Sequence, residues 1–88
     1  MDLIQVEKIY KALANRRRLA IILYLHKIKK ATVADISEHI DLSFTATSKH
    51  LQILKNVDFA RSNQTGLEQH YYLSDFGSKF IKNFMPII

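Results

Sequence analysis

The chain has 88 residues, of which 48% are hydrophobic, and it contains only two glycines and one proline. This length suits a single domain over residues 1–88, and the composition favours a folded, helix-rich protein over a disordered one. The lack of cysteine excludes disulfides and thiolate metal sites and fits a reducing cytoplasm, where we expect the protein to be located. We expect no signal peptide, because the chain opens with the acid Asp2 and its apolar residues are periodic. We expect no membrane span, because the longest apolar run, Leu19–Leu25, is far too short to cross a bilayer.

The formal net charge is +5, and the positive charge is concentrated at the front of the chain. Residues 1–30 hold eight Lys and Arg against Asp2 and Glu7, with Arg16–Arg18 as the densest point. Residues 31–57 carry a net charge of −1 and residues 58–88 balance to zero. A basic balance favours a polyanionic partner, although proteins of several classes share it.

Two helices are predicted in the first third of the chain. Residues 2–13 have a helical apolar stripe, and Asp2 with Gln5 has the spacing of a capping box. Asn15 is a candidate cap for a second helix, from Arg16 to about His26. That helix is apolar nearly all round after its arginines, which is typical of a helix at the centre of a core.

A pair of short helices follows. Thr32 and Asp35 indicate a capping box at the start of a helix over about 33–40, whose inner face carries Val33, Ile36 and Ile40. Residues 41–42 form a tight turn, and Ser43 can cap a helix that runs to about Asn56. The inner face of this second helix carries Thr47, Leu51 and Leu54. Two short amphipathic helices joined by a tight turn are the helix-turn-helix pattern.

The periodicity then changes to that of strands. Residues 59–64 and 68–73 read as a hairpin around Thr65-Gly66, because Gly suits a turn with positive φ and Tyr71 and Tyr72 favour strands. Ser74 is a candidate cap for a last helix that begins at Asp75 and ends before Pro86. The order is therefore four helices, a hairpin and a fifth helix, a mainly α fold with a small β-hairpin.

The helix after Ser43 carries the functional signal. Thr45, Ser48, Lys49 and Gln52 lie together on the side opposite its apolar residues, and such side chains can reach phosphates or base edges in the major groove. The preceding helix begins at Thr32, where free N–H groups and the helix dipole can hold a phosphate.

Three segments, KALANRRRLAIILYL, VADISEHIDLSFTATSKHLQIL and ARSNQTGLEQHYYLS, resemble the successive signatures of the ArsR-type winged helix-turn-helix repressors over residues 11–74. The resemblance implies a transcriptional regulator, a symmetric dimer on double-stranded DNA with residues 44–55 as the recognition helix. It implies dimerisation through residues 2–13 and 75–84, a helix-turn-helix over 32–56 and a wing over 59–73. The DNA-binding residues would be Thr32, Phe44, Thr45, Ser48, Lys49, Gln52, Arg61, Gln64 and Thr65. The dimer interface would hold Leu3, Val6, Ile9, Tyr10, Leu13, Phe76, Phe80, Ile81 and Phe84.

The sequence also departs from the family pattern. The cysteine-rich metal site of some members is replaced here by residues 31–35, and residues 75–88 contain no His, so neither family metal site carries over and we expect no metal or cofactor. The wing tip is usually basic in the family, whereas here Glu68 would repel phosphate. Contacts with DNA phosphates would then depend on Arg61, the recognition helix and the basic front of the chain. Phe44 stands where members often have Gln, and it can contact a thymine methyl or simply pack.

Other interpretations stay open at this point. Asp35 and His39, with Glu38 alongside, have metal-pair spacing, but a solvated helix face explains them as well. One or two of Arg16–Arg18 can face phosphates, and His50 reads as a packed residue. Competing functions are a winged-helix protein-interaction module and, less strongly, a basic helix at a membrane surface; nothing has the spacing of an enzyme active site. The operator and any small-molecule effector are not visible in the sequence.

Overall fold

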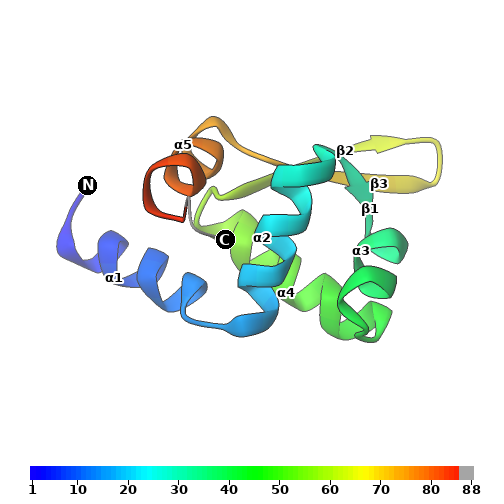
Figure 1. Cartoon of the computed structure of the whole chain (residues 1–88), viewed down its shortest axis with the longest axis horizontal. Coiled ribbons are helices and arrows are strands. Elements are labelled where there is room, and N and C mark those ends of the chain that lie inside the picture. Colours follow the sequence, from blue (N-terminus) through cyan, green and yellow to red (C-terminus); the bar gives the residue numbers. More distant parts are fainter. Residues whose placement is uncertain (86–88) are drawn as a thin grey trace.

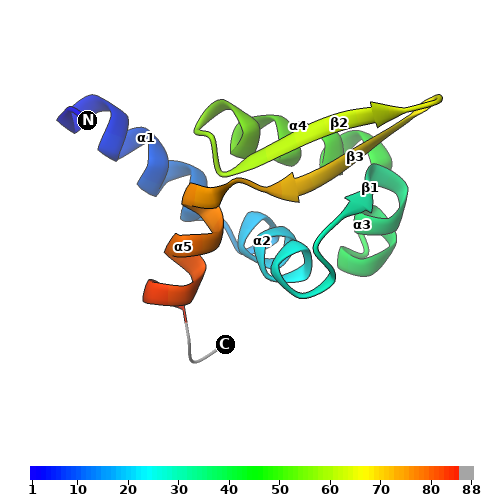
Figure 2. The same ribbon diagram turned by 90° about the horizontal axis from the view of Figure 1, so that it is seen from above.

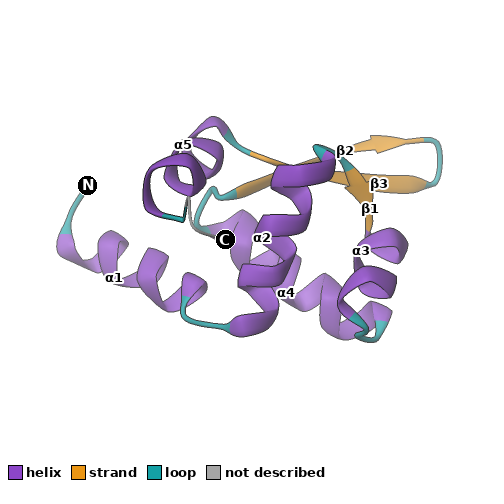
Figure 3. Ribbon diagram, viewed as in Figure 1, coloured by secondary structure: helices purple, strands orange, loops and turns teal. Residues whose placement is uncertain are grey.

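The computed structural model describes residues 1–85 and contains the predicted elements in the predicted order (Figure 1). Figure 3 shows the fold as mainly helical, with a small antiparallel sheet at one end. The elements are α1 (Leu3–Leu13), α2 (Arg16–Ile28), β1 (Ala31–Thr32), α3 (Val33–Ile40), α4 (Phe44–Asn56), β2 (Ala60–Thr65), β3 (Glu68–Leu73) and α5 (Asp75–Phe84).

Every helix begins at the N-cap that the sequence predicts. In each case the cap side chain accepts a hydrogen bond from the backbone N–H three residues later, which satisfies a donor that the helix itself leaves unpaired. At Asp2 the box is reciprocal, because the Gln5 side chain also bonds the Asp2 backbone N–H. The predicted stop at Pro86 lies outside the described residues. The caps are Asp2, Asn15, Thr32, Ser43 and Ser74.

The core is built around α2, as its nearly uniform apolar surface predicts. Ile21, Ile22 and Leu25 are at most 1% exposed, and α2 packs against α1, α3, α4, α5 and β3. Fully buried side chains from α3, α4 and the start of the hairpin complete the cluster, among them Ile36 and Phe59. Because one apolar cluster joins all the helices, the position of each polar face is set relative to a common core.

The sheet contains one strand more than the predicted hairpin. Its order is β1-β3-β2, all antiparallel, with Ala31 opposite Tyr71 and β2 paired to β3 from Ala60–Leu73 to Thr65–Glu68. The hairpin therefore turns at Gly66-Leu67, one residue later than predicted, and α2 runs to Ile28 instead of His26. A two-residue strand has no periodicity of its own, so β1 exists only because β3 lies beside it.

The two ends of the molecule carry different elements. Helix α1 projects at one end, while the tip of the β2–β3 hairpin, α3 and the beginning of α4 lie at the other (Figures 1 and 2). The molecule measures 37 × 27 × 21 Å along its principal axes. Within residues 1–85, no helix has the length and apolar character that a bilayer crossing needs.

Candidate nucleic-acid interface

Helix α4 has one buried face and one polar, open face. Thr47, Leu51 and Leu54 are 0% exposed, which confirms the predicted inner face. Because these three side chains anchor the helix to the core, the opposite side must face outward. That side presents Thr45, Lys49 and Gln52 as exposed residues and Ser48 as a half-buried one.

A groove of about 520 Å³ runs between α4, the beginning of α3 and the hairpin. It brings together four of the predicted site residues, three on α4 and one at the N-cap of α3, with residues of the hairpin. Thr32 lines it at the N-terminus of α3, where its hydroxyl caps the helix by accepting from Asp35 N at 3.1 Å. The predicted residues in the groove are Thr32, Phe44, Ser48 and Gln52, and the hairpin contributes Leu67, Glu68, Gln69 and Tyr71.

The hairpin tip is exposed but carries no positive charge. Gln64 and Thr65 are both exposed, and the Gln64 side-chain amide donates to Gly66 O at 3.2 Å. Gly66 has φ +64, the left-handed conformation that the predicted turn requires. Leu67 is 100% exposed and Glu68 stands beside it, so the tip offers polar and apolar contacts instead of cations.

Arg61, also predicted for the site, lies at the root of the hairpin and is held by an acid. Its Nε donates to Asp58 Oδ1 at 3.0 Å, and a terminal nitrogen donates to Oδ2 at 3.2 Å. The hydrogen bonds from Arg61 lower the pKa of Asp58, and Asp58 in turn raises the pKa of Arg61. This pairing was not predicted from the sequence, although the three-residue spacing of the two charges was a visible signal.

Two of the three arginines at the start of α2 are engaged within the protomer. Arg17 donates to Ile40 O at 3.0 Å and so ties α2 to the turn between α3 and α4. The Arg18 guanidinium donates to Ala12 O and, at 3.2 Å, to Lys11 O at the end of α1. The acceptors are carbonyls and lie up to 24 residues away in sequence, so no motif reveals them.

Arg18 also reaches the recognition-helix candidate. A guanidinium nitrogen lies 3.1 Å from His50 Nδ1, and since arginine can only donate, that ring nitrogen must accept. Burial lowers the pKa of His50, and the charges of Arg18 and Arg17 lower it further. The neutral His50 thus joins α4 to the junction of α1 and α2 through Arg18.

The hairpin and α4 are joined by a contact that sequence reasoning also missed. Lys55 Nζ donates to Ser62 Oγ at 3.0 Å, across from the end of α4 to β2. Further along α4, the Gln52 amide donates to Asn56 Oδ1 at 3.0 Å. The first contact sets the hairpin against the helix, and the second leaves the Gln52 carbonyl oxygen free of that bond.

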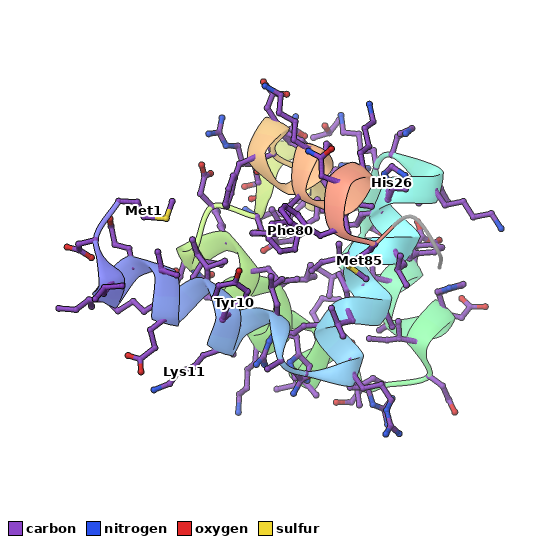
Figure 4. All side chains as sticks on the ribbon, turned by 60° about the vertical axis from the view of Figure 1, so that its left-hand side comes forward. Met1, Tyr10, Lys11, His26, Phe80 and Met85 are labelled. Carbon is purple, nitrogen blue, oxygen red and sulfur yellow. The ribbon has the colours of Figure 1, made fainter. Side chains whose placement is uncertain are left out.

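The predicted dimer interface divides into two groups. Leu3, Tyr10 and Phe84 are between 61% and 85% exposed, and Val6, Phe76 and Phe80 are partly so. A groove of about 250 Å³ between α1 and α5 brings most of these together, and Figure 4 shows Tyr10 and Phe80 on either side of it. The other three, Ile9, Leu13 and Ile81, are 9%, 7% and 3% exposed and belong to the protomer core, and Ile9 also lines this groove. Their place in a dimer interface stays a prediction.

Asp35 and His39 on α3 have the spacing of a metal pair, but His39 is engaged in a ring contact. The His39 ring stacks on Tyr24 of α2, with the ring centroids 4.0 Å apart and the planes 21° apart. Over residues 1–85, no three His, Asp or Glu side chains gather closely enough to hold a metal ion.

A helix-turn-helix packed on a three-stranded sheet whose hairpin lies beside the second helix defines the winged helix-turn-helix class of DNA-binding proteins. The sequence pattern of the bacterial regulatory proteins of the arsR family matches residues 15–62, more than half of the chain. The chain belongs to this family, whose members are transcriptional regulators and not enzymes.

Known proteins agree with this assignment. The chain is 33% identical over 70 residues to the "cadmium resistance transcriptional regulatory protein CadC homolog" of Staphylococcus aureus, covering 80% of this chain and 58% of that protein. It is 32% identical to the "arsenical resistance operon repressor" of Bacillus subtilis, over 78% of this chain and 66% of that protein. The chain thus spans only about 58–66% of the length of these relatives.

A solved structure is similar over most of the chain. It is the homodimeric winged helix-turn-helix DNA-binding domain of a possible ArsR-family regulator from Mycobacterium bovis. The TM-score is 0.85 and the sequence identity is 30%, covering 91% of this chain and 74% of that one.

Proposed function

We propose that the protein acts as a homodimeric repressor that binds double-stranded DNA sequence-specifically, with residues 44–55 in the major groove. The observation that carries this proposal is the exposed polar face of α4, held outward by three fully buried residues on the opposite face. Membership of a family of transcriptional regulators supports it, as do the repressor names of relatives. A dimer with this geometry would read two half-sites about one helical turn apart.

The residues have distinct roles in this proposal. Lys49 binds a phosphate or a guanine edge, Gln52 pairs with adenine, and Ser48 and Thr45 bond to phosphates or bases close to the helix. The N-terminus of α3 at Thr32 holds a phosphate through backbone N–H groups. Gln64 and Thr65 supply neutral contacts from the wing. Arg61 also carries a positive charge, but the ion pair with Asp58 partly neutralises it.

The test is a comparison of two matched double variants on DNA. Ser48→Ala/Lys49→Ala removes adjacent serine and lysine side chains from α4, and Ser78→Ala/Lys79→Ala removes the same pair from α5. In both pairs the serine is half-buried and the lysine exposed, so the two variants perturb folding similarly. Binding is measured on duplexes that the parent protein enriches from a random pool, between ~50 and ~200 mM salt.

We expect the α4 variant to lose specific binding and the α5 variant to keep it. The parent should lose affinity steeply with salt, and removing one phosphate contact should reduce the salt slope by about 1. Equal binding by both double variants would show that α4 is not the recognition helix. Enrichment of no sequence, with salt-independent binding to a protein partner, would instead favour an interaction module, for which the exposed Phe44 and Leu67 are the motivating residues.

The homodimer is proposed through α1 and α5. Their outer faces expose Tyr10 and Phe84 at a common apolar groove, with Leu3 also exposed on α1, and a second copy would cover this surface. The homodimeric state of the M. bovis domain supports a dimer. Tyr10→Asp should yield monomers in analytical ultracentrifugation, whereas Leu67→Asp, at an exposed leucine on the wing, should stay dimeric. Dimers of both variants would place the interface elsewhere.

No effector forms part of this proposal. Two relatives are named for cadmium and arsenical resistance, but no cysteine in these 88 residues can supply a thiolate ligand. We propose a cytoplasmic protein, because a bacterial repressor works where the chromosome lies.

A further inference from the structure

Phe44 is a large apolar side chain in an unusual position. It is the first residue of α4, directly after the Ser43 cap, and 59% of its surface is exposed. The other phenylalanines of the described chain, Phe59 and the three on α5, contact one another's rings. Within residues 1–85, Phe44 takes part in no such ring contact and does not belong to the core cluster. A single exposed apolar residue is ordinary on a protein surface, and what distinguishes Phe44 is its surroundings.

The surroundings of Phe44 are those of the proposed DNA-binding face. Phe44, Ser48 and Gln52 follow at intervals of four residues and line the same groove, about 520 Å³ in volume, between α4, α3 and the wing. Ser48 and Gln52 offer hydrogen bonds to base edges, while the phenyl ring can offer none. The ring therefore adds an apolar contact at the N-terminal end of the helix, the end that approaches bases in helix-turn-helix proteins.

The chemistry of the major groove leaves one good partner for such a ring. Base edges there present hydrogen-bond donors and acceptors, and the only apolar group among them is the C5-methyl of thymine. We propose that Phe44 is a specificity-determining residue, which packs on a thymine methyl at one position of each half-site. This inference rests on the proposed DNA-binding function and adds to it the base that one residue selects.

Uracil provides a direct test, because it pairs like thymine and lacks only the methyl group. The probe is a duplex enriched by the parent protein from a random pool, prepared with deoxyuridine in place of each thymidine in turn. Burial of one methyl-sized group corresponds to about fourfold in affinity, so replacement in both half-sites should weaken the parent about 15-fold. We expect this loss at one position of each half-site, related by the two-fold symmetry. At that position Phe44→Ala should bind thymine and uracil equally.

Two controls separate the methyl contact from a general loss of binding. Leu67→Ala removes the other strongly exposed apolar side chain of the groove and should keep the full preference for thymine over uracil. Thermal unfolding of Phe44→Ala should match that of the parent, because the side chain is mostly exposed.

Three other results would overturn the proposed contact between Phe44 and thymine. Specific binding by the parent with equal affinity for thymine and uracil at every position would overturn the inference and leave the proposed function standing. A preference for thymine that Phe44→Ala retains would overturn it as well. If the parent enriches no sequence from the pool, the inference and the proposed function fall together.

Discussion

Replacing Gly77 with alanine tests how closely α5 must approach the core. A Cβ at this position would lie 2.5 Å from the carbonyl oxygen of Phe59, a distance that real Cβ contacts essentially never show. That oxygen also accepts from Ser74 N at 3.0 Å, at the cap of the same helix. The helix therefore cannot move off the carbonyl without disturbing its own N-terminus.

Two opposing effects set the size of the change. To reach 3.0 Å the new Cβ must move by about 0.5 Å, and overpacking of this kind typically costs ~1–3 kcal/mol. Alanine regains about 1 kcal/mol of helix propensity relative to glycine. We therefore expect Gly77→Ala to lower the free energy of unfolding by up to ~2 kcal/mol, with a fall in Tm of about 4–8 °C per kcal/mol.

The assay is thermal and urea unfolding at matched protein concentration, because dimerisation makes Tm depend on concentration. Asn83→Ala, at an exposed position of the same helix, reports the propensity gain alone and should not destabilise the protein. The dimer should also weaken in Gly77→Ala, since the α5 aromatic residues move with the helix. A variant that melts at or above the parental Tm would show that the close contact does not constrain α5.

Two further predictions concern charged groups. The pKa of His50 is lowered in the folded protein by burial and by Arg18 and Arg17, so the folded state binds a proton less readily than the unfolded one. The contribution of His50 to stability should therefore be fully present above about pH 6.5 and fall as the pH drops below it. When the free energy of unfolding is measured in urea at several pH values across that range, His50→Gln should make it depend less on pH. An unchanged pH dependence would contradict this. Asp58→Asn removes the acid that holds Arg61 and keeps a residue type that tolerates the φ of +58 found there. DNA binding should then strengthen and its salt slope steepen by up to about 1, more than in Glu7→Gln, which removes the acid of the Glu7–Lys11 pair; equal effects would mean that Arg61 does not face DNA.

Much of the helix-turn-helix could be predicted because its signals are local. The Ser43 hydroxyl accepts from a backbone N–H only three residues away, so a few consecutive residues determine where α4 starts. The buried face of Thr47, Leu51 and Leu54 follows from helical spacing alone. The polar face opposite, which carries the proposed function, is located by the same spacing.

Other features depended on distant parts of the chain. Ala31 became a strand residue only because Tyr71 lies beside it, and Arg17 and Arg18 found carbonyl acceptors on other elements.

The sequence by itself determined the order of the helices and the hairpin, the N-cap of each helix and the polar face of α4, since periodicity and capping act within a few turns of helix. Tertiary structure decided which apolar residues of α1 and α5 face the core and which remain outside: Ile9 is 9% exposed and the neighbouring Tyr10 is 61% exposed. It also placed Phe44, Ser48 and the wing around one groove. No local rule sets that juxtaposition, because it depends on how α3, α4 and the hairpin pack on the shared core.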